Sequence, residues 1–291
     1  MTQAYPPPEH VLRDLDFDAV VAGEAHHRAT YRPAGAGSTA LGGLLTVIDV
    51  LAGTVCMRAI APDWMATSGL TFHLCGPLPA DMLEIDAHLL RAGRTTVTIE
   101  VLVEGPGGRP VGEGVVTFAR LVRRDTNLFL DDADHTRVGA RIEFPTDRAR
   151  PVGRGRSLLD AIGCEVVDAA RGLTRTPMSP YVRNSFGAMN GGVVAGLVEA
   201  AALAGTQGSA VQGPAVQGSA VQGSVVQDVA IHYLTQGKVG PIETRVRPLR
   251  SEVGHSSVRV EVIDAGAAER TMAVAHVGVS TVTGSGIASG V

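Results

Sequence analysis

The chain has 291 residues, of which 45% are hydrophobic and 19% charged, and its formal net charge is −4. This composition is typical of a folded protein with room for two modest domains. The negative charge argues against nucleic acid or an anionic membrane as the main partner. No run of about eighteen uninterrupted apolar residues indicates a membrane span.

The cysteines and the first residues bear on the compartment. Cys56, Cys75 and Cys164 are widely spaced and odd in number, so they predict neither a disulfide framework nor a metal-binding pair. Residues 1–10 are rich in proline and lack the basic and then apolar pattern of a secretion signal. We therefore expect a reduced, cytoplasmic location.

The chain is predicted to begin with an arm over residues 1–20, which docks on a first unit over residues 21–125. Early in that unit, residues 41–53 form an almost wholly apolar helix that starts at Leu41, Gly42 and Gly43. Its single acid, Asp49, follows Gly42 by seven residues. A lone carboxylate in a helix that is apolar on all sides has no solvated face, which indicates a functional role.

Alternating apolar and polar residues predict antiparallel strands after this helix, over residues 68–74, 92–101 and 115–121. The glycine-rich run 104–109 predicts a hairpin turn between two of them. A long apolar helix is stable only where a curved sheet wraps around it. The first unit is therefore predicted to be a helix followed by a meander.

The second unit, over residues 150–285, repeats this order after a polar linker over residues 126–149. Asn190, Gly191 and Gly192 begin its apolar helix. Gly192 corresponds to Gly42, and Glu199 corresponds to Asp49. In the strand after each helix, His232 corresponds to His73. Residues 207–226 are four glycine-rich pentapeptides, and they predict a surface loop.

Together these patterns predict an α+β fold in which two antiparallel sheets each wrap around a long buried helix. Because the units repeat one another, a pseudo-two-fold axis is expected between them.

The segment from Asn190 through Gly191 and Gly192 to Glu199, with its meander, resembles the hotdog-fold acyl-CoA thioesterases of the phenylacetate-pathway type. That family most often has His where Asn190 stands. The copy that begins Ala40-Leu41-Gly42 is a weaker match. The resemblance covers most of residues 20–125 and 150–283.

The resemblance implies a double hotdog that hydrolyses an acyl-CoA thioester to a carboxylate and free coenzyme A. It also implies active sites between the units. No Cys or His cluster in the sequence supports zinc, so we expect no metal and no cofactor apart from the coenzyme A of the substrate. Homo-oligomers of double units are a further expectation.

Helix geometry limits how these residues cooperate. Seven residues of helix span about 10.5 Å, so an acid and the glycine N–H of its own helix cannot both contact one carbonyl. If the helices are antiparallel, Asp49 faces Asn190, Gly191 and Gly192, and Glu199 faces Leu41 and Gly42. Each helix N-terminus then suits the oxyanion that forms when a thioester is attacked.

The acid would act as a general base on water or attack the thioester directly, and the spacing does not choose between them. We favour Asp49, because its site includes the polar side chain of Asn190, whereas Ala40 holds that position in the other site. Thr46, one turn before Asp49, is a candidate for positioning a water molecule.

Two other functions fit the pattern. A hotdog enoyl-CoA hydratase or dehydratase normally has an Asp–His pair before the helix, and no such pair precedes Asn190. A non-catalytic acyl-CoA binding protein would use neither acid. Arginines that suit the phosphates of coenzyme A, and that equally suit solvated strand faces, are Arg91, Arg94, Arg245, Arg247 and Arg250.

Overall fold

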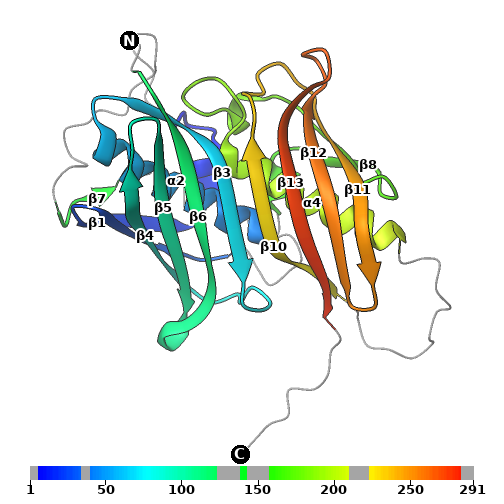
Figure 1. The fold of residues 1–291 in the computed structure, drawn as a ribbon, viewed down its shortest axis with the longest axis horizontal. Helices are drawn as coiled ribbons and strands as arrows, with labels where there is room; N and C mark the ends of the chain where they lie inside the picture. Colours follow the sequence, from blue (N-terminus) through cyan, green and yellow to red (C-terminus); the bar gives the residue numbers. More distant parts are fainter. Residues whose placement is uncertain (1–5, 34–39, 123–137, 143–156, 210–222, 283–291) are drawn as a thin grey trace, which may run out of the picture.

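The computed structural model describes residues 6–33, 40–122, 138–142, 157–209 and 223–282. Two units lie side by side in it, each with a long helix against an antiparallel sheet (Figure 1). The first unit has helices α1 (Val11–Asp14) and α2 (Leu41–Ile60), the 3₁₀ turn η1 (Pro106–Gly108), and strands β1 (Phe17–Gly23), β2 (His26–Tyr31), β3 (Trp64–Leu74), β4 (Leu83–Ala92), β5 (Thr96–Gly105), β6 (Arg109–Leu121) and β7 (Arg141–Ile142).

The second unit follows the same order. It has helices α3 (Leu158–Ala161) and α4 (Gly191–Ser209), the 3₁₀ turn η2 (Pro180–Val182), and strands β8 (Glu165–Asp168), β9 (Leu173–Thr176), β10 (Gly223–Tyr233), β11 (Ile242–Glu252), β12 (His255–Asp264) and β13 (Arg270–Val282). The predicted helix and meander are thus present twice.

All the described strands belong to one antiparallel sheet, in the order β7-β1-β2-β4-β5-β6-β3-β10-β13-β12-β11-β9-β8. The two predicted antiparallel sheets join edge to edge through β3 and β10 and form one continuous sheet. In that junction Thr71 pairs with Ala230, His73 with Asp228, and Gly69 with His232. His73 and His232 lie equally far from the central pair, which confirms both their correspondence and the pseudo-two-fold axis.

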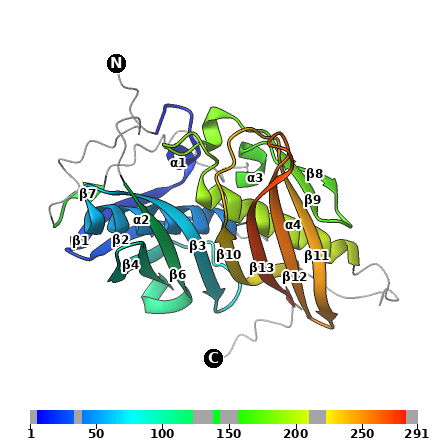
Figure 2. The ribbon, with the colours of Figure 1, turned by 45° about the horizontal axis from the view of Figure 1, so that its top comes forward.

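Helices α2 and α4 cross on one side of this sheet, which curves over them (Figures 1 and 2). They approach through small residues: a Cβ on Gly42 would lie 2.7 Å from the Gly196 Cα, and a Cβ on Gly192 would lie 2.3 Å from the Thr46 Cα. Larger side chains at these glycines would force the helices apart. The two contacts are related by the repeat, so the crossing is symmetric.

Helix α2 is long and apolar enough to cross a membrane by length and composition alone. However, 78% of its most apolar window is buried inside the protein, under the sheet and against α4. It is therefore a core helix of this fold, and its apolar character on all sides reflects that burial.

Several boundaries differ from those expected. Strand β1 begins at Phe17, so part of the predicted arm over residues 1–20 belongs to the sheet. Residues 207–209 end α4 and residues 223–226 begin β10, and the rest of the predicted loop lies outside the described residues. Within the predicted linker, β7 pairs with β1, and most of the remainder is also outside them. Other strands that were not predicted are β1, β2, β4, β8, β9 and β11.

The β5–β6 hairpin was predicted, and the structure confirms it. Gly107 and Gly108 in its turn have φ angles of 73° and 74°, a conformation that residues with a Cβ rarely adopt.

The close contact between α2 and α4 predicts that an alanine in place of Gly192 destabilises the protein. We expect Gly192→Ala to lower the free energy of unfolding by about 1–3 kcal/mol, because the added Cβ meets the backbone of α2. Urea denaturation measures this loss. Gly76→Ala is the control, since nothing lies within 4 Å of a Cβ there. Equal stability of the two variants would mean that the crossing tolerates side chains.

Candidate functional site

Asp49 is held at the N-terminus of the opposite helix. Its side chain is almost fully buried, and Thr67 Oγ1 on β3 donates a hydrogen bond of 2.8 Å to Asp49 Oδ1. Asp49 Oδ2 lies beside Gly191, so closely that a Cβ on Gly191 would be 2.9 Å from it. Glycine at this position therefore gives the carboxylate room against the first turn of α4.

Two hydrogen bonds fix the first turn of α4. Asn190 caps the helix, since its Oδ1 accepts a hydrogen bond of 2.9 Å from the Gly192 N–H. The Tyr233 hydroxyl on β10 donates a hydrogen bond of 2.8 Å to the Gly191 carbonyl. Among the described residues no acceptor contacts the Gly191 N–H. This N–H and the positive end of the helix remain available to a ligand.

A cavity with a volume of about 370 Å³ opens onto these groups, and Asp49, Thr67, Asn190, Gly191 and Tyr233 all line it. The rest of its wall is mostly apolar and includes Leu12, Val50, Met57, Trp64, Met65, Phe186, Met189, Leu234 and Met272. Trp64 and Phe186 meet edge to face, with ring centroids 5.3 Å apart. A carboxylate, a helix N-terminus and an apolar cavity therefore meet where the two units touch.

Glu199 occupies the mirror position, at the N-terminus of α2. Its Oε2 accepts a hydrogen bond of 2.8 Å from the Gly42 N–H, and its Oε1 accepts one of 3.3 Å from the Leu41 N–H. The crossed arrangement predicted from helix length is thus confirmed. Here, however, the acid itself takes the N–H groups that a ligand would need.

The second site is also closed. Glu199 is 3% exposed and does not line the cavity. The Leu158 side chain of α3 packs over the crossing, 3.4 Å from where a Cβ of Gly42 would lie. The residue of β10 that corresponds to Thr67 of β3 is Val226, because each is the last paired residue before the bulge in its strand. A valine offers Glu199 no hydroxyl. The two sites of the repeat have therefore diverged.

Burial raises the pKa of both acids, but to different extents. For Asp49 the pKa rises to about 6, since burial outweighs the hydrogen bonds from Thr67 and the Gly192 N–H. For Glu199 the pKa rises to about 8, since burial outweighs the hydrogen bonds from the Gly42 and Leu41 N–H groups. At pH 7 the Asp49 carboxylate is mostly ionised, whereas Glu199 is mostly protonated. Only Asp49 is then ready to act as a base.

The remaining predicted residues pack at the crossing and do not line the cavity. Thr46 Oγ1 donates a hydrogen bond of 2.7 Å to the Gly42 carbonyl in its own helix, and Thr46 abuts Gly192. Gly43 makes room for the buried Tyr31 side chain, whose hydroxyl would lie 2.4 Å from a Cβ there. Thr46 as a water-positioning group and Gly43 as a substrate contact therefore have no geometric support.

Thr67 and Tyr233 are functional candidates that the sequence analysis missed. Thr67 lies one residue before the predicted strand over residues 68–74, and Tyr233 follows His232 in the matching strand. The signal available in the sequence was a hydroxyl side chain in or next to each of the two strands that follow the long helices. Each contact lies within one unit, Thr67 of β3 with Asp49 of α2 and Tyr233 of β10 with Gly191 of α4. They depend on how each strand packs against its helix, and no local pattern reveals this.

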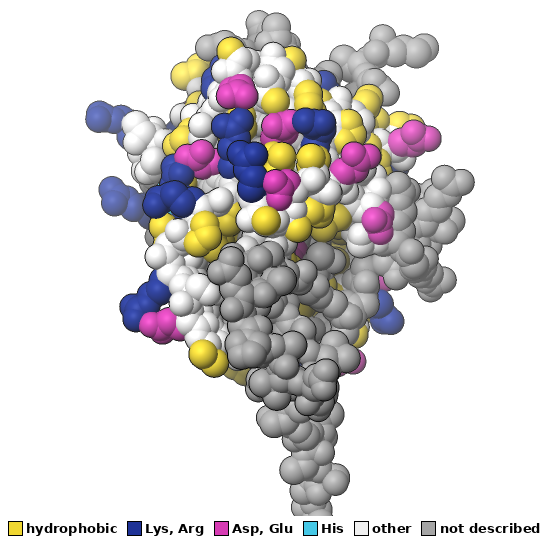
Figure 3. Space-filling model, turned by 90° about the vertical axis from the view of Figure 1, so that its right-hand side faces the viewer, with side chains coloured by type: hydrophobic (Ala, Val, Ile, Leu, Met, Phe, Trp, Pro, Cys, Tyr) yellow, Lys and Arg dark blue, Asp and Glu magenta, His cyan; other side chains and the backbone are white. Residues whose placement is uncertain are grey.

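The arginines considered for coenzyme A phosphates lie away from the cavity lining. Arg245 pairs with Glu269 at 3.2 Å, and Arg250 pairs with Glu252. Figure 3 faces the right-hand side of Figure 1, where β11 lies, and shows basic and acidic side chains interspersed there. All five arginines are exposed, and a role for them at the phosphates of coenzyme A stays a prediction.

Comparison with known proteins bears on the class of this fold. Residues 31–119 match the family model of the acyl-CoA thioesterase N-terminal domain, and this segment contains Asp49 and Thr67. Solved structures also share the architecture over almost the whole chain. A protein of unknown function with a hot dog fold from Alicyclobacillus acidocaldarius is 12% identical and covers 94% of this chain and 98% of its own, with a TM-score of 0.53.

Two further structures are similar. The acyl-CoA thioesterase II TesB2 of Mycobacterium marinum is 12% identical and covers 94% of this chain and 97% of its own, with a TM-score of 0.51. The tesB protein of Mycobacterium avium subs paratuberculosis is 11% identical and has the same coverages, with a TM-score of 0.50. A comparison with curated proteins finds no match.

The fold is therefore a double hotdog. The domain match over residues 31–119, which includes Asp49, supports acyl-CoA thioesterase function and hence a thioester hydrolase.

The buried acids predict how stability depends on pH. Because the pKa of Glu199 is raised from 4.5 to about 8 on folding, the unfolded chain releases this proton at lower pH. The free energy of unfolding should fall as pH rises from 4.5 to about 8. For one group the fall is at most about 1.4 kcal/mol per pH unit. Asp49 adds a similar fall only up to about pH 6.

Between pH 6 and 8, Glu199→Gln should therefore flatten the fall in unfolding free energy, as measured by urea denaturation at several pH values. The slope is the readout, since the amide also changes the hydrogen bonds at α2. A variant with the same slope as the wild type would contradict the raised pKa.

Proposed function

We propose that the protein hydrolyses acyl-CoA thioesters at one composite site, formed by Asp49 of the first unit and the N-terminus of α4 in the second. The observation that carries this proposal is the ionisable Asp49 carboxylate beside the available Gly191 N–H in an apolar cavity. Water-activating base, oxyanion donor and acyl pocket are the three parts that thioester hydrolysis needs.

The cavity suits the acyl part of the substrate. Its wall is mostly aliphatic, thioether and aromatic, so burial of an apolar acyl group drives binding. The thioester carbonyl then points to the Gly191 N–H, and the polar coenzyme A extends toward solvent. Methionines at positions 57, 65, 189 and 272 give this wall an adaptable shape.

Hydrolysis follows from the arrangement of the polar groups. Asp49 accepts a proton from water as the water attacks the carbonyl carbon, and the negative charge on the carbonyl oxygen is stabilised by the Gly191 N–H and the dipole of α4. Thr67 holds Asp49 Oδ1, so that Oδ2 is presented to the water. The intermediate then collapses with release of the coenzyme A thiolate, which leaves the carboxylic acid.

Direct attack by Asp49, which forms a mixed anhydride, is the alternative route. A single turnover in ¹⁸O-labelled water separates the two routes. General-base catalysis puts the label in the product acid alone, whereas hydrolysis of the anhydride at its aspartyl carbonyl puts the label in Asp49.

Several finer assignments belong to the same proposal. The phenylacetate-pathway type rests on the Asn190–Gly192 motif with Glu199. A substrate-borne coenzyme A as the sole cofactor, a cytoplasmic location and a homo-oligomer of double units stay predictions. Crotonyl-CoA hydration without thiol release would favour the hydratase, and tight acyl-CoA binding without turnover would favour the binding protein.

Replacing the acid tests the proposed site directly. Asp49→Asn should lower kcat at least about 100-fold, because the amide cannot accept the proton from water. Release of free thiol from a series of acyl-CoAs measures the change. In the wild type, kcat should rise with pH through about 6, the pKa of Asp49.

Glu199→Gln distinguishes the two sites of the repeat. It should keep most of the thiol release, since Glu199 lies in the closed site. A folded Asp49→Asn protein with full activity would refute the assignment, and a loss in Glu199→Gln as large as that in Asp49→Asn would mean that the second site works.

Thr67 is predicted to act through Asp49. Thr67→Val keeps the shape but removes the hydrogen bond to Oδ1, so kcat should fall about tenfold and the ascending limb of the pH profile should move to higher pH. Thr67→Ser should restore both. If Thr67→Val lowers kcat without moving the pH profile, the hydroxyl does not act on Asp49.

A further inference from the structure

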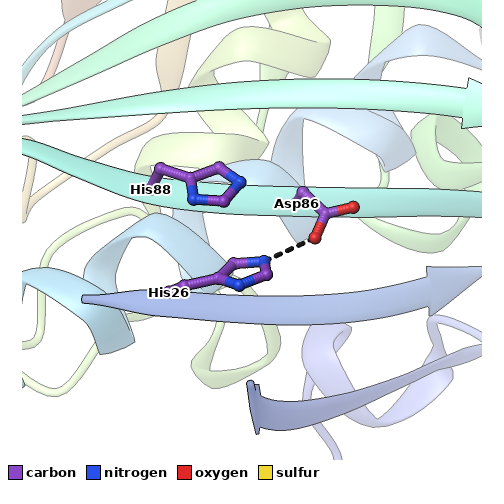
Figure 4. Close-up of side chains that lie close together, drawn as sticks. All are labelled: His26, Asp86 and His88. Atoms are coloured by element: carbon purple, nitrogen blue, oxygen red, sulfur yellow. Dashed lines mark hydrogen bonds and ion pairs between the residues drawn. The ribbon is translucent and has the colours of Figure 1, made fainter. Parts of the chain in front are cut away.

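A second group of chemically active side chains lies on the outer face of the first unit. His26 on β2 and Asp86 and His88 on β4 are close together there (Figure 4). In the register of the sheet, His26 pairs directly with His88. Their neighbours His27 and Ala87 point into the core and are buried, so the three side chains project from the opposite face, away from α2.

The three side chains are already within reach of one another. His26 Nε2 lies 2.5 Å from Asp86 Oδ1. The His26 and His88 rings are stacked, with centroids 4.0 Å apart and an angle of 17° between their planes. One possible ligand atom from each residue lies within 4.8 Å of the others. All three residues are half-buried, so water is partly excluded.

Negative charge surrounds this cluster. Glu84 pairs directly with Glu104, and Glu100 pairs directly with His88, all on the same outer face of β4 and β5. Like charges directly opposite each other in a sheet are destabilising. Arg28 contacts Asp86 Oδ1 at 3.0 Å. Within the described chain Asp86 Oδ2 has no hydrogen-bond partner.

We propose that His26, Asp86 and His88 bind a divalent transition-metal ion such as Zn²⁺. Imidazole nitrogens and a carboxylate oxygen are ligands that this class of ion prefers. Ligands of a tetrahedral zinc ion lie about 3.3 Å apart, so rotation of the side chains closes the site without movement of the strands. Arg28 keeps its contact with Oδ1 while Oδ2 binds the ion, and a water molecule completes the coordination.

A metal ion here would fasten β2 to β4. The inner face of β2 carries His27, whose Nδ1 lies 2.7 Å from Thr54 Oγ1 of α2, and Thr54 lines the cavity. The ion would therefore stabilise the wall behind the cavity without reaching Asp49. This proposal stands independently of the proposed hydrolysis.

Metal binding is tested on the full chain, prepared without a histidine tag and stripped with a chelator. Titration calorimetry with ZnCl₂ should show one ion per chain with a Kd in the micromolar range or tighter. Zn²⁺ should also raise Tm, because it binds the folded chain alone. Co²⁺ should give visible absorption bands characteristic of nitrogen and oxygen ligands in a site of low coordination number.

His26→Asn and His88→Asn should each weaken Zn²⁺ binding at least about tenfold, a loss as large as outer-shell changes at zinc sites produce. His73→Asn is the matched control. His73 Nδ1 lies 2.6 Å from Asp228 Oδ1 in a similar cross-strand pair, and among the described residues that pair belongs to no three-ligand group. It should bind Zn²⁺ as the wild type does.

Circular dichroism without metal checks that each variant is folded, and Asp86→Asn provides a third variant if either histidine change disrupts the sheet. Absence of Zn²⁺ binding by the wild type overturns the proposal, as does wild-type binding by both histidine variants. Equal weakening by His73→Asn would also overturn it, because the ion would then bind surface histidines in general.

Discussion

The close antiparallel contact of α2 and α4 is the constraint on which the rest of the structure depends. Gly42 and Gly192 let the backbones approach within the reach of a single Cβ. That approach carries each acid to the first turn of the other helix, about 10 Å from the start of its own. Without it, neither acid would meet a helix N-terminus, and the sheet could not close over both helices as one layer.

The same contact has been put to two uses. At Glu199 the acid bonds to the N–H groups of α2 and is covered by Leu158, so it stabilises the junction of the units. At Asp49 the carboxylate is held by Thr67 and faces a cavity. The exchange of Thr67 for Val226 at corresponding positions contributes to this difference. The duplication has thus supplied two corresponding sites, and in one of them the acid holds the two helices together.

The sequence predicts the parts of this architecture that leave a periodic or repeated trace. The glycine-to-acid spacing predicts both helices and their crossing, and the match of His73 with His232 agrees with the register of β3 and β10. Thr67, Tyr233 and the cavity could not be predicted in this way. Thr67 lies 18 residues from Asp49 and Tyr233 lies 42 residues from Gly191, and only the packing of each strand against its helix brings these residues together. The joining of two sheets into one was also beyond local patterns.

The length of α4 separates the chemistry from the repetitive part of the chain. The helix has 19 residues, so its ends are about 28 Å apart. Asp49 meets its first turn, whereas the pentapeptide repeat begins in its last turn, at Gln207. Gain or loss of a repeat unit during replication would then lengthen or shorten the connection to β10 at modest entropic cost. A change in repeat number would therefore leave in place the first turn of α4, which the Asp49 carboxylate meets.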